Sequence, residues 1–451
     1  MVSRPLAFYY GWWGANLPRA RLLGLDSFHP LAEEKKADPA LVACWLLSEA
    51  CLHLRLGCAE ACMETVDRGL AILAELDVRT WEPLFLSLQS WAAMAKGDLV
   101  AAERAIDRMV GHASMPRLAL CLYHYSAGIL ARRRGDVPTA DLHGRVSVGL
   151  ALASGMPLAE VLCRFAGALS EAPAVMQTEL ERGLALGRQC GSTSMTSQGL
   201  LALALAAMRR GDDAEAAERL REGFGLAQDA GLLEATLLRP DELAECCAFA
   251  LERGTEPQHV SELVRTLALV PGERAAALKS WPWSLRIEAL GGFAFQQEGE
   301  RMQPCVQGRT RPIETLKLLV IHGTCGLRQE QLMEALWPDA DGDAAHQALG
   351  TTLYRPRKLL GRGDVVVQRS GRVALDPRLV FVDAWAMERL LCEAETVQPG
   401  DANAAGRIEA LRSQLRELYR GDLFGQAGTR PPFAEARARL RERTSKWIAL
   451  T

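Results

Sequence analysis

The residues with the clearest chemical potential are the basic side chains between positions 344 and 372. In this stretch six basic residues accompany one acid, Asp364, which gives a local net charge of +5. Guanidinium and ammonium groups gathered in this way bind polyanions, because they neutralise phosphates and release condensed counterions. The basic residues are Arg355, Arg357, Lys358, Arg362, Arg369 and Arg372. The stretch therefore predicts a nucleic-acid partner, although a solvated basic surface would have the same composition.

Motifs for catalysis, nucleotide binding or metal binding do not occur in the sequence. It lacks H-E-x-x-H, G-x-S-x-G, C-x-x-C and G-x-x-x-x-G-K-[ST], and its eight histidines form no constellation. One group of cysteines is close enough in sequence for thiols to meet on facing helices as a metal or redox site: Cys44, Cys51, Cys58 and Cys62. Cysteine also serves as a small apolar residue in tight helix packing, and we favour that interpretation. We expect no enzyme and no cofactor.

Two glycine-centred markers recur through the first 280 residues. The first is a Gly, usually followed by Asp, with Ala four or five residues after the Gly. Its copies start at Gly57, Gly97, Gly135 and Gly211, at spacings of 40, 38 and 76 residues. The second is Gly-Leu-Ala, at Gly69, Gly149, Gly183 and Gly225. Gly permits a tight turn between helices, and Ala lets the following helix pack closely, so the period predicts a helical solenoid.

This pattern resembles tetratricopeptide repeats over about residues 40–270, with a period similar to that of the maltose-regulator-like subgroup of bacterial transcription activators. The resemblance implies a concave surface that receives a protein or small-molecule signal. Large regulators of that subgroup also carry an ATPase domain, for which this chain has no motif.

A change of pattern at Trp281-Pro282-Trp283 predicts a second kind of structure. The period-2 alternation of strands begins after it, and the net charge changes from −6 over residues 1–281 to +3 over residues 282–451. We expect strands at 285–290, 293–297 and 301–306, helices at 312–321, 329–337 and 343–360, and a hairpin of strands 365–368 and 372–375. The fold class is thus mostly α: a helical-repeat solenoid, then a small α+β module and a short helical extension.

In this order the elements resemble the winged helix-turn-helix domain of OmpR-type and antibiotic-regulatory-protein-type bacterial activators. The segments 383–391 and 418–423 are similar to the start of the bacterial transcriptional activator domain, in shortened form. The domains expected are 1–280 for the repeats, 284–382 for the winged helix and 383–451 for the activator-like helices. The resemblance implies a cytoplasmic transcriptional regulator with two partners, double-stranded promoter DNA and RNA polymerase.

The helix period decides which side chains of the third helix would face DNA. If Leu349, Leu353, Pro356 and Leu360 face the core, then Gln347, Thr351, Arg355 and Lys358 lie opposite, flanked by Thr352 and Tyr354. Arg355 suits guanine and Gln347 suits adenine, whereas Arg357 and Lys358 suit phosphates better. Other candidate DNA contacts are Arg369 and Arg372 in the hairpin, with a solvated hairpin as the alternative, and Arg309, Arg311 and Gln329 at the backbone.

Two residues depart from the winged-helix pattern. Pro356 replaces a leucine within the third helix, where proline removes a hydrogen bond at a cost of about 3 kcal/mol, so we expect a kink or an early end near Thr352–Pro356. Arg328 replaces the usual serine cap of the second helix. The alternative function is therefore a repeat-based adaptor whose winged domain has lost DNA binding and docks a protein.

The sequence also predicts that the chain does not enter a membrane. Its best apolar run, from Gly199 to Met208, is shorter than the roughly 18 residues that a spanning helix requires. The aromatic segment Leu6–Gly14 lacks a cleavage site, and we interpret it as a helix that packs on the first repeat rather than as a signal peptide. The scattered cysteines fit a reducing cytoplasm.

Overall fold

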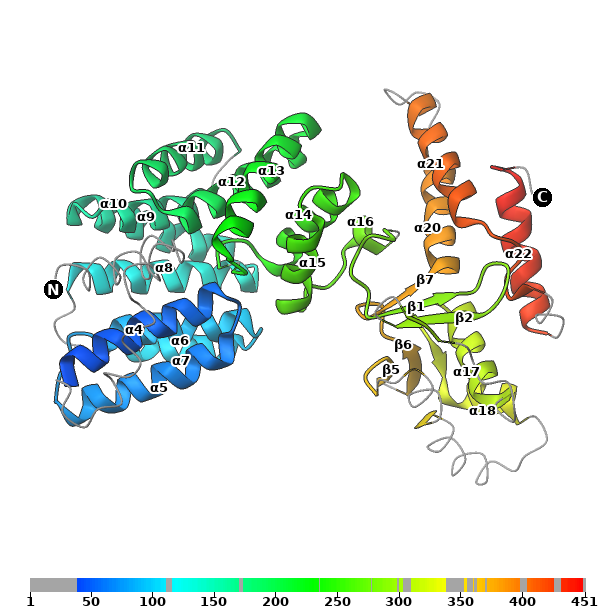
Figure 1. Cartoon of the computed structure of the whole chain (residues 1–451), viewed down its shortest axis with the longest axis horizontal. Helices are drawn as coiled ribbons and strands as arrows, with labels where there is room; N and C mark the ends of the chain where they lie inside the picture. Colours follow the sequence, from blue (N-terminus) through cyan, green and yellow to red (C-terminus); the bar gives the residue numbers. More distant parts are fainter. Residues whose placement is uncertain are drawn as a thin grey trace. The chain divides into compact units, whose positions relative to one another are not determined.

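A computed structural model shows a mostly helical chain, as predicted, that divides into two compact units, Met1–Val270 and Pro271–Thr451 (Figure 1). The structure describes residues 39–110, 116–169, 173–234, 236–276, 278–297, 300–302, 310–337, 353–354, 360, 363–369, 371–397, 404–425 and 431–448. Among these residues, no helix is long and apolar enough to cross a membrane. The predicted helix at Leu6–Gly14 lies outside them.

The first unit consists of successive antiparallel helix pairs. Their bounds are α4 Pro39–Arg55 and α5 Ala59–Glu75, α6 Glu82–Ala95 and α7 Leu99–Val110, α8 Arg117–Arg134 and α9 Val137–Ser154, α10 Pro157–Ala168 and α11 Pro173–Gln189, α12 Thr193–Arg210 and α13 Asp213–Ala230, α14 Pro240–Glu252 and α15 Pro257–Thr266. The first helix of each pair contacts the first helix of the next, so α4, α6, α8, α10, α12 and α14 form a continuous inner row. This is a tetratricopeptide-like helical repeat, as predicted.

The Gly-Asp marker forms the turn within a helix pair. The backbone φ angle is +78° at Gly135 and +77° at Gly211, a region that residues with a Cβ seldom adopt. The aspartate that follows is the N-cap of the next helix: the Asp136 carboxylate accepts the Thr139 N–H at 3.2 Å, and Asp212 acts on α13 in the same way. One marker therefore ends a helix and starts another.

The Gly-Leu-Ala marker has a packing role in two of its copies. A Cβ at Gly69 would lie 2.2 Å from Cε1 of Phe85, and a Cβ at Gly183 would lie 2.6 Å from Cε1 of Phe165. Both rings are buried, and each fills the space that the missing side chain leaves. Gly149 has nothing within 4 Å of its Cβ position, so this copy has no packing role.

The second unit begins with α16 (Glu273–Ala276) and contains two small sheets. The first sheet has the order β3-β2-β1-β7, with β1 Leu285–Glu288, β2 Ala294–Gln297, β3 Glu300–Met302 and β7 Val380–Val382. The second has the order β4-β6-β5, with β4 Leu327–Arg328, β5 Val366–Arg369 and β6 Arg372–Leu375. Helices α17 (Thr310–Ile321) and α18 (Gln329–Leu336) lie near the expected ranges.

Two strands of this unit were not predicted from the sequence. β7 pairs in parallel with β1, opposite Leu285–Ile287, and β4 pairs with β6. With three and two residues, respectively, they are too short to display an alternating pattern, and tertiary pairing alone makes them strands. The expected third helix, 343–360, lies outside the described residues apart from Leu353, Tyr354 and Leu360.

The last helices are α20 Asp383–Thr396, α21 Ala404–Leu418 and α22 Phe433–Ser445. Asp383 joins the start of α20 to the first sheet: its two carboxylate oxygens accept the backbone N–H groups of Ala289 at 2.7 Å and Leu290 at 3.1 Å. Burial raises the pKa of Asp383 to about 6, although these hydrogen bonds act in the opposite direction.

Candidate functional site

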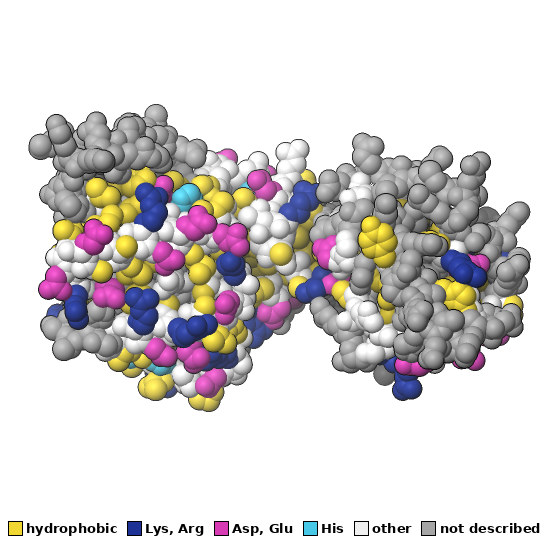
Figure 2. Space-filling model, turned by 90° about the horizontal axis from the view of Figure 1, so that it is seen from below, with side chains coloured by type: hydrophobic (Ala, Val, Ile, Leu, Met, Phe, Trp, Pro, Cys, Tyr) yellow, Lys and Arg dark blue, Asp and Glu magenta, His cyan; other side chains and the backbone are white. Residues whose placement is uncertain are grey.

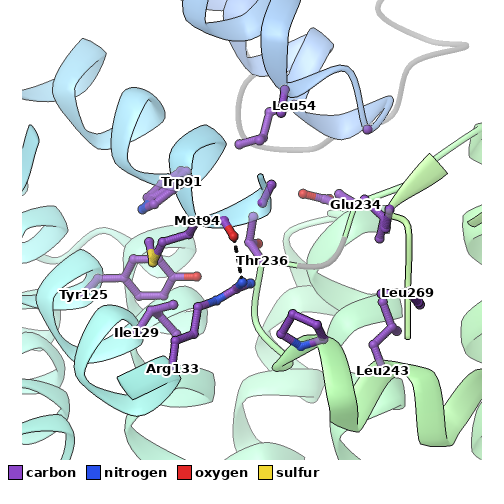
Figure 3. Close-up of a pocket in the computed structure, with 15 residues that line it drawn as sticks. Leu54, Trp91, Met94, Tyr125, Ile129, Arg133, Glu234, Thr236, Leu243 and Leu269 are labelled. Carbon is purple, nitrogen blue, oxygen red and sulfur yellow. Dashed lines mark hydrogen bonds between the residues drawn. The ribbon is translucent and has the colours of Figure 1, made fainter. Parts of the chain in front are cut away.

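The candidate site is a small pocket on the inner row of the repeat array (Figure 3). It is lined by Leu54, Gly57, Ala59, Trp91, Met94, Ala95, Tyr125, Ile129, Arg133, Glu234, Thr236, Pro240, Leu243, Leu267 and Leu269. Helices α4, α6, α8 and α14 supply most of these residues, so the pocket exists only because distant repeats meet.

Aromatic and aliphatic side chains dominate this pocket. Trp91 and Tyr125 pack edge to face with ring centroids 5.4 Å apart, and the indole N–H of Trp91 donates to the Ser126 hydroxyl at 2.9 Å. Arg133 donates to the Met94 carbonyl at 2.9 Å, the hydrogen bond drawn in Figure 3. An apolar surface with a few fixed polar groups is the usual composition of a ligand pocket.

A buried ion pair joins the first repeat to the segment after α13. Arg55, at the end of α4, donates to the Glu234 carboxylate at 2.5 Å, although the two residues are 179 positions apart. The Ser194 hydroxyl donates to the same carboxylate. Burial by itself lowers the pKa of Arg55, but the Glu234 charge outweighs it and the net pKa is raised. The Arg55 guanidinium therefore remains protonated at all ordinary pH values.

A second buried ion pair joins α8 to α14. Arg132 donates to Glu242 at 2.7 and 2.5 Å, Arg209 of α12 donates to the same carboxylate at 2.8 Å, and the Arg239 N–H donates to it at 3.0 Å. Burial raises the pKa of Glu242, but Arg132 and the other donors outweigh it and the net pKa is lowered. Each of the two ion pairs therefore joins parts of the array that are far apart in the sequence.

No pattern in the sequence marks these inner-face residues. Arg55, Arg132, Glu234 and Glu242 are common residue types without a motif, and each pair is separated by more than 100 positions. The one local signal was an arginine near the end of an inner helix. An arginine at that place is equally explained by its favourable interaction with the helix dipole.

The predicted DNA-binding residues are only partly described by the structure. Gln347, Thr351, Thr352, Arg355, Arg357, Lys358 and Arg309 lie outside the described residues, and so does the expected kink at Pro356. Arg369 belongs to β5, but its side chain is outside them too. Leu353 and Leu360 are buried, as expected for the core side of the third helix, and Tyr354 is 60% exposed.

Arg372 has a structural role that the sequence did not suggest. Its Nε donates to the Cys325 carbonyl and a terminal nitrogen donates to the Gly326 carbonyl, both at 2.8 Å. These bonds tie β6 to the turn before β4, where Gly326 has a φ angle of +64°. Its guanidinium therefore has fewer donors left for DNA than we expected.

Three further predicted residues also occupy defined positions. The Arg311 guanidinium lies 5.5 Å from the centroid of the Trp337 ring. The Gln329 N–H donates to the Gly371 carbonyl at 3.0 Å and so joins α18 to the hairpin turn. The Arg328 side chain does not cap α18, and the Arg328 backbone N–H donates to Gln331 Oε1 at 3.3 Å.

Two of the four cysteines at the start of the array pack in its interior. Cys51 and Cys62 are buried, and burial raises the pKa of both thiols, which makes them poor nucleophiles. Cys58 is exposed. The described residues contain no group of three or more His, Cys, Asp or Glu side chains that could hold a metal ion.

No family model matches the sequence, and no curated protein matches it either. Several solved structures align with the chain, and two of them are Rap proteins. A Rap protein in complex with competence and sporulation factor has a TM-score of 0.41 and 11% identity, with 98% of each chain covered. The apo form of RapI has a TM-score of 0.35 and 8% identity, with 99% of each chain covered.

Proposed function

We propose that this chain is a regulatory binding protein of the cytoplasm that acts by recognition rather than by catalysis. Its repeat array receives a protein or small-molecule signal, and the second unit passes that signal on. The observation that supports this proposal is the pocket of Trp91, Tyr125 and Leu243 on the inner row, because it combines apolar walls with a few oriented polar groups.

The surface charge of the array favours a protein or peptide partner over a polyanion. On the face in Figure 2, acidic and basic side chains of the first unit are interspersed instead of being gathered by sign. Ion pairs such as that of Arg188 with Glu222 join neighbouring repeats. A polyanion would require a field of one sign. We therefore favour a protein or peptide as the partner of the array.

A peptide library displayed on phage and selected against the full chain tests this function. Ala95 lines the pocket and is exposed, so Ala95→Arg places a large side chain there without burying a charge. Leu152→Arg is the matched control, since Leu152 is 51% exposed and does not line the pocket. We expect selected peptides to bind Ala95→Arg at least tenfold more weakly than the control. Peptides that bind both variants equally well would contradict the proposal.

A second candidate function is binding of promoter DNA by residues 284–382. It is supported by the succession of α17, α18 and the β5-β6 hairpin, and by the pattern of buried Leu353 and Leu360 with exposed Tyr354. On this hypothesis residues 383–451 are a shortened activator domain, and RNA polymerase is a further partner. Arg355 would then contact a base edge, and Arg357 and Lys358 would contact phosphates.

Salt dependence separates the two candidates. A DNA-binding form should lose affinity for double-stranded DNA steeply as salt rises, with a log–log slope of several units. Arg355→Ala should then relax the base preference, whereas Arg188→Ala, in an exposed pair of the first unit, should not. If the purified chain does not bind a pool of promoter DNA at about 50 mM salt, and Pro356→Leu creates binding, the adaptor function is favoured.

A further inference from the structure

The segment between α13 and α14, residues 232–239, lies against the inner row without regular secondary structure, and we call it the inner segment. Its described residues are 232–234 and 236–239. Three leucines anchor it, since Leu232, Leu237 and Leu238 are each only 3% exposed. Leu232 packs in a cluster with Leu52 and Leu56 of the first repeat. A non-helical stretch of the chain is therefore largely buried in the array.

Residues of the inner row satisfy the main chain of the inner segment. The Leu233 N–H donates to the Arg55 carbonyl at 2.8 Å, and the Leu237 N–H donates to Oε1 of Gln198 at 3.2 Å. Arg132 donates to the Leu237 carbonyl at 3.2 Å. A peptide without regular secondary structure leaves its backbone groups unpaired, so a surface that buries one must supply donors and acceptors. Helices α4, α8 and α12 supply them here.

An acidic side chain is the charged anchor of the inner segment. Glu234 is 7% exposed, and both of its carboxylate oxygens are 2.5 Å from the same Arg55 nitrogen. Ser194 adds a hydroxyl donor to this carboxylate. A charge-assisted contact of this kind selects for a carboxylate, because a neutral side chain would leave the buried guanidinium uncompensated.

We propose that the inner segment is an internal ligand, which occupies a peptide-binding surface of the array until an acidic, leucine-rich, non-helical peptide of a partner protein displaces it. The proposal rests on the proposed function, in which the array binds a partner. Partner and inner segment exclude each other, because both require Arg55, Arg132 and Gln198.

The inner segment is covalently attached at both ends, and this attachment determines how tightly a partner peptide must bind. A segment attached at both ends has an effective concentration on the order of millimolar, so a free peptide with the same contacts competes poorly. The partner peptide therefore needs contacts that the inner segment does not make. The pocket of Trp91 and Tyr125 offers them, since Glu234 and Thr236 of the inner segment line that pocket.

The test uses a fluorescent peptide with the sequence of residues 231–240, GLLEATLLRP, titrated into the full chain and followed by anisotropy. Glu234→Gln removes the charge of the inner segment and leaves every residue of the peptide-binding surface in place. We expect this variant to bind the peptide at least tenfold more tightly than the unmodified chain. A peptide with Gln in place of Glu should bind weakly, and adding Arg55→Gln should abolish the gain. Glu222→Gln, in the exposed pair with Arg188, is the matched control.

A second variant guards against the possibility that Glu234→Gln does not fold. Leu237→Ala removes an apolar anchor from the inner segment and leaves the Arg55–Glu234 pair intact, so it should also admit the peptide. If either variant is folded by circular dichroism and binds the peptide no better than the unmodified chain, the inner segment is not an internal ligand. Equal binding of the Glu and Gln peptides would overturn the proposed acidic preference.

This experiment and the test of the proposed function can fail separately. The phage selection measures binding to the unmodified chain and its loss in Ala95→Arg, whether or not the inner segment moves. The peptide titration measures release of the inner segment. If the phage selection succeeds and the peptide titration fails, the array is still a binding surface. Only the proposed displacement of the inner segment is then wrong.

Discussion

Replacement of Glu242 by Gln tests how much the buried ion pair with Arg132 stabilises the array. Glu242 is 3% exposed and Arg132 is 8% exposed, so both charges are largely removed from water. The substitution keeps the size of the side chain and removes the only carboxylate that these contacts place beside Arg132 and Arg209. The guanidinium of Arg132 then lies buried near another cation.

The expected loss follows from the burial of the pair. Removal of one partner from a buried ion pair costs about 3–5 kcal/mol, because the remaining charge is uncompensated. Arg209 contributes little to this loss, since its side chain is 46% exposed and screened by solvent. Arg132→Met combined with Glu242→Gln removes both buried charges, and we expect the double variant to lose less than half as much as Glu242→Gln alone.

The assay is urea unfolding of the full chain. Pulsed hydrogen exchange, measured on peptides from α8 and α14, reports the unfolding at each urea concentration. This readout isolates the first unit, which matters because a chain of two units need not unfold in one step. Glu222→Gln is the exposed control and should change the free energy of unfolding by about 1 kcal/mol or less. A loss below about 1 kcal/mol in Glu242→Gln would refute our account of the buried pair.

The stability lost in Glu242→Gln should depend on pH, and the direction of this dependence follows from the pKa of Glu242. The pKa of Glu242 in the folded state is lower than its ordinary value of 4.5. The folded state therefore binds this proton less tightly than the unfolded state, and the stability it contributes is present above pH 4.5 and lost as pH falls through the folded-state pKa. The stability difference between the unmodified chain and Glu242→Gln should be constant from neutral pH to about 5 and should shrink below 4.5.

Three further predictions concern other parts of the chain. Gly69→Ala should destabilise the array, because its Cβ would overlap the ring of Phe85, whereas Gly149→Ala, in an exposed helix position, should stabilise it by up to about 1 kcal/mol; thermal melts of both variants decide this. Asp383, with a pKa raised from 3.8 to about 6, should make the second unit less stable as pH rises across that interval, a slope that Asp383→Asn should remove in urea titrations. Asp212→Ala should cost about 1 kcal/mol through loss of the α13 cap, measurable as a lower urea midpoint.

The repeat array was predictable because its turns are local. The φ angle of a glycine and the capping bond of the following aspartate depend on residues three or four positions apart, so each copy displays its own signal. Strands β1, β2, β5 and β6 were found near their expected ranges for the same reason, since alternation is a local pattern. β4 and β7 lack such a pattern and depend on partners about 45 and 95 positions away.

The candidate site was not predictable in this way. The basic stretch that first suggested chemistry, residues 344–372, lies mostly outside the described residues, and its DNA contacts stay a prediction. The sequence assigned Arg372 to DNA on its charge, whereas the fold uses its donors to hold two carbonyls of a turn. Charge and residue type do not reveal which donors a tertiary structure has already used.

The sequence by itself determined a mostly helical chain with a repeat period near 40 residues, because glycine turns, aspartate caps and apolar periodicity act over short distances. Only the tertiary structure decided what the inner face of the repeats contains. The curvature of the array brings Arg55 to Glu234 and Arg132 to Glu242, and it buries the inner segment against α4, α8 and α12. Curvature is the sum of small rotations between neighbouring repeats, so it is a property of the whole array that no single repeat encodes.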